Sequence, residues 1–207
     1  MFAGSFSSPV MAEIHGIRQF VVQSRSTLGG IDPESGEILW STPVEASRGM
    51  NILTPLVSGN RIFTSTYEGG SFCFEIEQID GKQSAKLQWR LPKVEGYMTS
   101  PVIVDGYIYH KARDKQLYCI NFSTGTVQWE SEQGFGQYWS MVVNGNQILA
   151  LDEQGDLLLF EANPDDFQIT DQRKISKEPT WAHLAVSGNQ VFIRGLKTMT
   201  AYSWNEN

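Results

Sequence analysis

The chain has 207 residues, of which 41% are hydrophobic and 12% aromatic, enough for one domain with a core. Its net charge of −7 argues against nucleic acid or an anionic membrane as the main partner. No stretch approaches the roughly 18 apolar residues of a membrane span. Residues 1–6 lack the basic and apolar regions of a signal peptide. No helical period exceeds about two turns, so the chain is predicted to be almost entirely β.

A six-residue phrase recurs along the chain. Ser-Gly-Glu-Ile-Leu-Trp at 35–40 returns as Thr-Gly-Thr-Val-Gln-Trp at 124–129, and a degraded copy lies at 84–89. Each copy follows a run that reads as strand, turn, strand, turn, strand. The third strands have equivalent centres 40 to 46 residues apart, at Gly30, Cys73, Cys119, Leu159 and Ala201. This spacing is the length of a four-stranded propeller blade.

Turn and strand signals agree with this period. Proline opens three of the repeats, at 9, 55 and 101, where a strand tolerates a missing N–H. Two-residue turns that contain one glycine, at 59, 106, 145 and 188, are typical of tight hairpins, and alternating apolar runs follow them. The predicted organisation is one propeller arc over 1–207, with blades at about 7–45, 50–92, 97–132, 137–172 and 179–205. Four blades are expected to have four strands and the fifth to have three.

The two cysteines, Cys73 and Cys119, occupy the same position of neighbouring repeats. A mid-strand residue that faces the next blade has to be small or apolar, so we expect two buried free thiols. A disulfide is the alternative, and it would need equivalent strands of neighbouring blades to approach within its Cα limit. Cysteine content therefore does not decide the redox compartment.

The run at 99–129 resembles the PQQ-like (quinoprotein-type) β-propeller repeat, and the resemblance extends in register from Ser7 to Tyr202. It implies a ring of about eight four-stranded blades. The tryptophans of the fourth strands would pack between blades, at Trp40, Trp89 and Trp129. In the fourth repeat Ile169 is expected to replace this tryptophan. We expect the chain to be the C-terminal half of a larger bacterial propeller, completed by more of the same protein, a protein partner or a second copy.

The resemblance leaves two functions open. The family includes non-catalytic members, among them the propeller lipoprotein of bacterial outer-membrane protein assembly, and this favours a periplasmic or exported scaffold that binds proteins or ligands. It also includes dehydrogenases that use PQQ and calcium. No Cys-Cys pair is present, and no residues match their calcium ligands or base. We therefore predict no catalytic residue, metal or cofactor in this chain, with a fragment of a PQQ- and calcium-dependent oxidoreductase as the alternative. A thermal shift on adding PQQ and Ca²⁺ would distinguish them.

The candidate binding residues are those predicted to gather at one mouth of the propeller channel. They are Arg48, Asn51, Tyr97, Tyr138, Trp139, Trp181 and His183. Aromatic walls with a few polar anchors suit a flat ligand or a peptide. The alternative is that these side chains plug the channel or cap the blades. The three histidines lack metal-ligand spacing, and the acidic stretch 152–156 is predicted to be a solvated turn.

Overall fold

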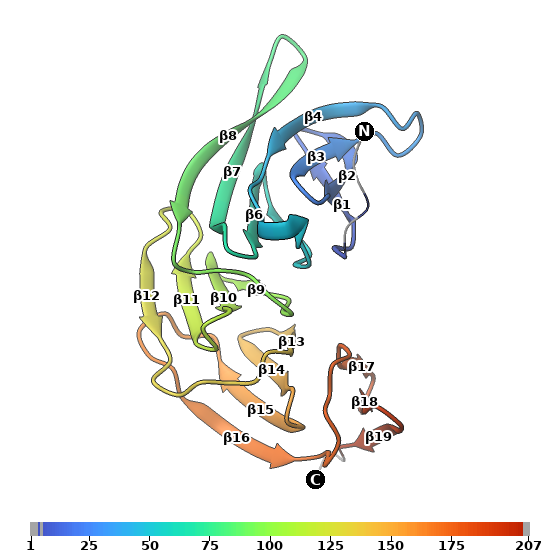
Figure 1. Ribbon diagram of the computed structural model, residues 1–207, viewed down its shortest axis with the longest axis vertical. Helices are drawn as coiled ribbons and strands as arrows, with labels where there is room; N and C mark the ends of the chain where they lie inside the picture. Colours follow the sequence, from blue (N-terminus) through green and yellow to red (C-terminus); the bar gives the residue numbers. More distant parts are fainter. Residues whose placement is uncertain (1–3, 5, 205–207) are drawn as a thin grey trace. The chain divides into compact units, whose positions relative to one another are not determined.

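A computed structural model describes residues 4 and 6–204 (Figure 1). Most of the stretch examined for a signal peptide, and the predicted end of the fifth repeat, lie outside these residues. In the described part, nineteen strands form five antiparallel sheets, and one 3₁₀ turn, η1, spans Ser47–Gly49. No helix in this part is long and apolar enough to cross a membrane.

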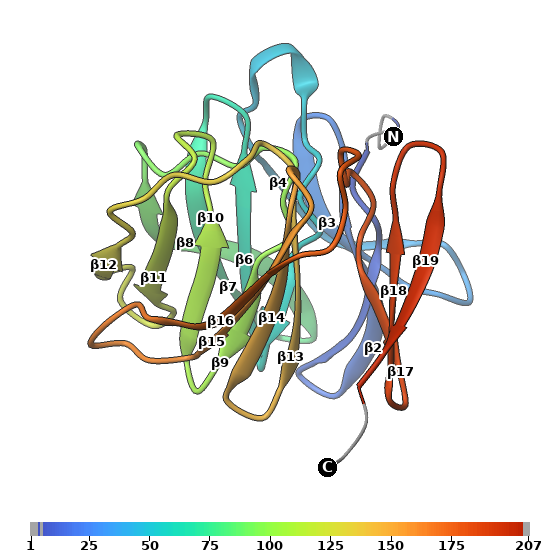
Figure 2. The same cartoon turned by 90° about the horizontal axis from the view of Figure 1, so that it is seen from below.

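Each sheet contains consecutive strands in chain order, and we name the sheets blades 1 to 5. Blade 1 is β1 (Val10–Ile14), β2 (Ile17–Gln23), β3 (Thr27–Ile31) and β4 (Ile38–Pro43). Blade 2 is β5 (Leu56–Ser58), β6 (Arg61–Thr66), β7 (Gly70–Ile79) and β8 (Lys82–Leu91). Blade 3 is β9 (Val102–Val104), β10 (Tyr107–Lys111), β11 (Leu117–Asn121) and β12 (Val127–Glu130). Blade 4 is β13 (Trp139–Asn144), β14 (Gln147–Asp152), β15 (Asp156–Glu161) and β16 (Ile169–Lys174). Blade 5 is β17 (Ala185–Ser187), β18 (Gln190–Arg194) and β19 (Met199–Ser203), visible as the red three-stranded sheet in Figure 2.

The fold prediction is confirmed: the protein is an all-β partial propeller with four four-stranded blades and a three-stranded fifth. The described residues form two compact units. The first contains the chain up to Tyr97 together with the turns Ala112–Asp114 and Phe122–Thr126. The second contains the remainder, including the sheets of blades 3, 4 and 5.

A β-bulge recurs in each four-stranded blade, between the third and fourth strands. The pairing shifts after Gly30, Cys73, Cys119 and Leu159. Just before the shift, the residue opposite is a tryptophan in blades 1 to 3, namely Trp40, Trp89 and Trp129. A bulge adds one residue to one strand, so it changes which side chain reaches a given face.

The prediction for the fourth repeat was wrong by two residues. Asp171, not Ile169, pairs with Leu159 and so occupies the tryptophan position. Ile169 pairs with Phe160, as Val127 pairs with Ile120 in blade 3. The longer turn between β15 and β16 displaces the fourth strand relative to the sequence alignment. Blade 4 therefore has a carboxylate where blades 1 to 3 have an indole.

The tryptophans lie in cores shared by neighbouring sheets or turns. Trp40 is 4% exposed and packs in a cluster with Val21 of blade 1 and Phe74 of blade 2. Trp129 packs against a cluster built by blades 3 and 4, and its Nε1 donates to the carbonyl of Asn163 at 2.8 Å. Trp89 donates to the carbonyl of Phe122 at 2.9 Å, within the first unit.

Both cysteines are buried free thiols, as predicted. Burial raises the pKa of Cys73 to about 12 and that of Cys119 to about 11. Because the thiolate is the reactive form, both side chains act as small core residues near neutral pH.

The buried His110 makes the stability of the protein sensitive to acid. Burial, with a smaller contribution from the charge of Lys111, lowers the pKa of His110 from 6.5 to about 3. Below pH 6.5 His110 therefore binds a proton in the unfolded chain but not in the folded chain. As a result, stability falls as the pH drops from 6.5 towards 3. We expect this residue to remove about 2 kcal/mol of stability between pH 6.5 and 4.5.

Urea unfolding of the wild type and His110→Phe at several pH values checks this prediction. Other titrating groups affect both proteins, so the difference between the two pH slopes isolates His110. Equal slopes would show that His110 is not held neutral in the folded state.

Candidate functional site

The turn between β14 and β15 anchors two long loops in the second unit. Asp152, 4% exposed, accepts hydrogen bonds from the backbone N–H of Gly136 at 2.6 Å and of Gln154 at 2.7 Å. The backbone carbonyl of Asp152 accepts from Thr180 Oγ1 at 2.5 Å. A buried carboxylate that receives two N–H groups fixes backbone geometry. The expectation of a solvated turn is therefore wrong for Asp152, because the loop before β13 folds over it.

Glu153, next to this anchor, holds an aromatic pair. Its Oε2 accepts from the N–H of Gln137 at 2.7 Å, and its Oε1 accepts from Trp181 Nε1 at 3.2 Å. The ring of Trp181 stacks on that of Tyr138, with centroids 5.1 Å apart and planes 20° apart. We call Tyr138, Glu153 and Trp181 the aromatic platform.

The platform combines exposure with rigidity. Trp181 is 50% exposed, so half of its surface is accessible to a partner. The backbone ties both loops to the same turn, through Glu153 N to Tyr138 O at 2.9 Å and Thr180 N to Glu153 O at 2.9 Å. The fully buried Lys111 adds a hydrogen bond from Nζ to the carbonyl of Gln137 at 3.1 Å. Rings held in one orientation lose little conformational entropy on binding.

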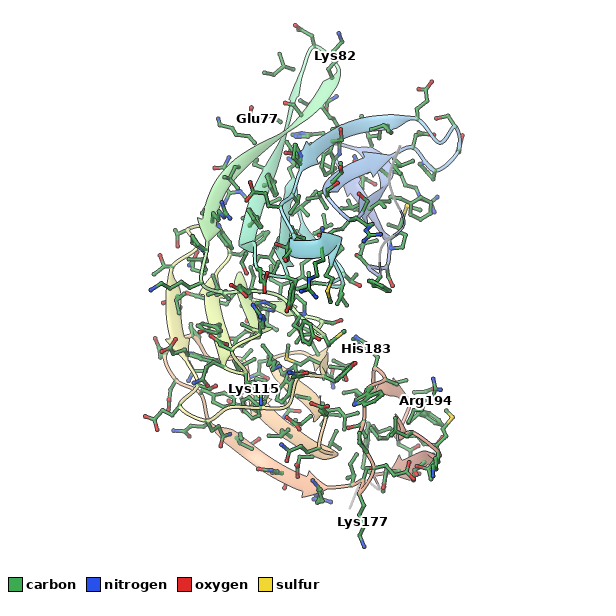
Figure 3. All side chains as sticks on the ribbon, in the orientation of Figure 1. Glu77, Lys82, Lys115, Lys177, His183 and Arg194 are labelled. Carbon is green, nitrogen blue, oxygen red and sulfur yellow. The ribbon has the colours of Figure 1, made fainter. Side chains whose placement is uncertain are left out.

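His183 lies in the loop that leads into β17 (Figure 3). Its Nε2 is 2.7 Å from the hydroxyl oxygen of Ser100. Partial desolvation lowers the pKa of His183, which favours the neutral ring, and the tautomer decides whether the hydroxyl or the ring nitrogen donates. Among the described residues no carboxylate contacts the other ring nitrogen, so the pair lacks the third member that orients a catalytic histidine.

Trp139 lies directly after the platform loop but points into the core. It is 3% exposed, and its ring centroid is 4.6 Å from that of Phe135. Of the four predicted mouth residues in the second unit, the structure thus brings Tyr138 and Trp181 together, pairs His183 with Ser100 and buries Trp139.

The other three predicted residues belong to the first unit. Asn51 is fully buried, and its side-chain nitrogen donates to the carbonyls of Ser24 at 2.8 Å and Arg25 at 3.2 Å. Arg48 is exposed, has φ 54° within η1, and its carbonyl accepts from the Arg25 side chain at 3.0 Å. These two residues shape the connection between blades 1 and 2.

Tyr97 belongs to a separate aromatic and ionic cluster of the first unit. Its ring lies 5.4 Å from that of Tyr67, and the guanidinium of Arg113 lies 4.4 Å from the Tyr67 centroid. Arg113 also pairs with Glu95 at 2.8 Å and with Glu68 at 3.3 Å. Exposed ion pairs of this kind stabilise weakly, so the cluster mainly orients side chains.

Sequence reasoning missed Glu153 and Arg113. Both residues follow the second strand of their blade. The main-chain N–H of each donates to a carbonyl in the loop before that blade. Arg113 donates to Glu95 O at 2.8 Å, and Glu153 donates to Tyr138 O at 2.9 Å. This repeat position was a usable signal, because in these two blades it lies beside the connection that carries the predicted mouth residues. In the described part of the chain, no three His, Cys, Asp or Glu side chains gather as metal ligands.

Comparison with known proteins gives a family and a fold. Residues 3–131 match the family model described as outer membrane protein assembly factor BamB. No curated protein sequence matches the chain.

Three solved structures share the fold. The crystal structure of BamB from Moraxella catarrhalis superposes with a TM-score of 0.69 and 14% identity, over 98% of this chain and 59% of that one. The computationally designed Ika8 protein gives 0.68 and 13%, over 91% and 55%. The β-propeller domain of Cps50 (Swd1) from Myceliophteria thermophila gives 0.66 and 10%, over 90% and 66%. The chain therefore spans between 55% and 66% of these relatives.

Proposed function

Because the chain belongs to the PQQ-like β-propeller family described as outer membrane protein assembly factor BamB, we propose that it is a non-catalytic scaffold that binds a protein partner. The observation that carries this proposal is the aromatic platform, an exposed Trp181 stacked on Tyr138 and held by Glu153. Rigid, exposed aromatic side chains on loops are frequent anchors of protein interfaces.

The hydrogen bonding of Glu153 gives its carboxylate an orienting role in the platform. Both carboxylate oxygens are already engaged, one by a backbone N–H and one by the indole of Trp181. A carboxylate bound at both oxygens is held in one orientation. It therefore orients a ring that a partner can cover.

The family also motivates the cellular setting of the proposal. Its description names outer membrane protein assembly. We extend this to the chain as a role in the periplasm, in a propeller that further residues or a partner complete. The partner would be another protein of such an assembly.

Truncation of the platform tests the proposed interface. The immobilised chain captures proteins from a bacterial periplasmic extract, and the affinity of the purified partner is measured by calorimetry. We expect Trp181→Ala and Tyr138→Ala each to weaken binding about 30-fold, the size typical of an interface anchor. Circular dichroism should be unchanged, because Trp181 is half exposed.

Phe20→Ala is the matched control, since Phe20 is an aromatic residue that is 36% exposed and lies outside the platform. It should retain wild-type affinity for this partner. Unchanged binding in both platform variants would refute the proposed interface.

A further inference from the structure

A row of four paired residues crosses one face of each four-stranded blade. The rows of blades 2 and 3 are built alike, because residues paired across a ladder point to the same face. They are Leu56, Phe63, Cys73 and Trp89 in blade 2, and Val102, Tyr109, Cys119 and Trp129 in blade 3. The indole lies 5.9 Å from the second-strand ring in both blades. In both, the two middle residues are at most 1% exposed.

In the corresponding row of blade 4, no indole covers the two middle residues. It consists of Val142, Leu149, Leu159 and Asp171. The side chain of Asp171 is 49% exposed and pairs with Arg173 at 3.0 Å. Leu149 and Leu159 remain only half-buried. A short carboxylate that points to solvent cannot replace the apolar area of an indole.

A cavity of about 550 Å³ lies where this cover is missing, between blades 4 and 5 of the second unit. Its wall from blade 4 includes Val142, Leu149 and Leu159, and its wall from blade 5 includes Val186 and Trp204. Val186 is 42% exposed and Trp204 is 44% exposed. The volume lies within the range of small-molecule pockets, and the wall is mainly apolar.

The backbone carbonyl of Trp204, a residue that lines the cavity, can serve as an acceptor for an indole N–H. In the first unit Trp89 donates to the carbonyl of Phe122, the first residue after β11. Trp204 is likewise the first residue after β19. Among the described residues its carbonyl accepts a long contact from Asn189 Nδ2 at 3.4 Å, and a carbonyl oxygen has a second lone pair for another donor.

We propose that this cavity binds an aromatic side chain, best an indole, carried by a segment of a partner protein. The equivalent positions in blades 1 to 3 of the same chain hold an indole borne on a strand, which identifies the shape and chemistry of the occupant. Asn144 and Gln147 line the cavity and supply amide groups for the backbone of the bound segment. The site shares no residue with the aromatic platform, so it stands independently of the proposed function.

N-acetyl-tryptophanamide is a suitable probe of the site, because it carries an indole between two peptide groups. The full chain, labelled at its Leu and Val methyl groups, is titrated with the probe and followed by NMR. We expect saturable shifts at Leu149, Leu159 and Val186, with a Kd of roughly 0.1–1 mM. N-acetyl-leucinamide should bind at least fivefold more weakly. Free indole that binds while the amide does not would overturn the proposal in favour of a small-molecule site.

Filling the cavity with an indole from the chain itself is a second test of the proposed occupant. Leu159→Cys with Asp171→Trp gives blade 4 the third- and fourth-strand residues of the blade 3 row, and we expect it to fill the cavity, raise the melting temperature and abolish the shifts of the remaining methyl groups. The control, Leu159→Cys with Gln172→Trp, places the indole on the opposite face of β16 and should keep probe binding.

Val186→Asp gives a second test that does not depend on the graft folding. This substitution places a charge at an exposed position of the cavity wall and should weaken the affinity for the probe at least tenfold. An absence of saturable shifts in the wild type, or equal probe binding by the wild type and Val186→Asp, would overturn the proposal.

Discussion

Trp40→Ala is expected to lower the free energy of unfolding of the first unit by about 3–5 kcal/mol, the usual cost of removing a large aromatic side chain from a core. The ring is 4% exposed and packs in the cluster shared by blades 1 and 2. Its Nε1 also donates to Gln19 Oε1 at 2.6 Å, and Gln19 is fully buried. The substitution therefore leaves both a cavity and a buried acceptor without its partner.

Guanidinium unfolding, with amide hydrogen exchange in β1–β8, measures this effect. Trp40→Phe should lose less stability than Trp40→Ala, because phenylalanine keeps much of the buried apolar area although it cannot make the hydrogen bond. Trp181→Ala is the control for loss of an exposed tryptophan and should change stability by less than about 1 kcal/mol. Similar losses of stability in Trp40→Ala and Trp181→Ala would contradict a structural role for Trp40 in the core between blades 1 and 2.

Asp152→Ala is expected to cost the second unit about 2–5 kcal/mol, because it strips a charged acceptor from two backbone N–H groups. Those groups belong to Gly136, in the loop before β13, and to Gln154. The loop that carries Tyr138 should loosen, so binding of the partner captured by the platform should fall as well.

Chemical unfolding and hydrogen exchange at Gly136 and Gln137 check this prediction. Glu153→Ala is the matched control, since it removes a half-buried carboxylate from the adjacent position. It should reduce stability less than Asp152→Ala while still releasing Trp181. Retained protection at Gly136 in Asp152→Ala would show that the carboxylate is not what holds the loop.

The repeat and its turns were predictable because they depend on local chemistry. Period-two alternation and glycine turns place strands to within a few residues, and the third-strand positions of Gly30, Cys73 and Cys119 emerged in register. A mid-strand glycine at 30 is also explained by packing, since a Cβ there would collide with the indole of Trp40.

The candidate site was predictable only in part. Tyr138 and Trp181 were predicted to converge, and their rings stack. Trp139 and Asn51 were included because their repeat position lies near the mouth, yet both side chains are buried. Whether a loop residue points outward depends on which backbone groups it must satisfy, as for Asn51, and no periodicity encodes that requirement.

By itself the sequence determined the blade count, the strand order and the small residues beneath the tryptophans, because turns and alternation act over a few neighbouring residues. Only the tertiary structure decided that Asp171 rather than Ile169 stands in the tryptophan position, and that Glu153 holds Trp181. The physical reason is that a longer turn resets the pairing of the strand that follows it. Each residue of β16 therefore pairs two positions away from where the repeat spacing alone would place it.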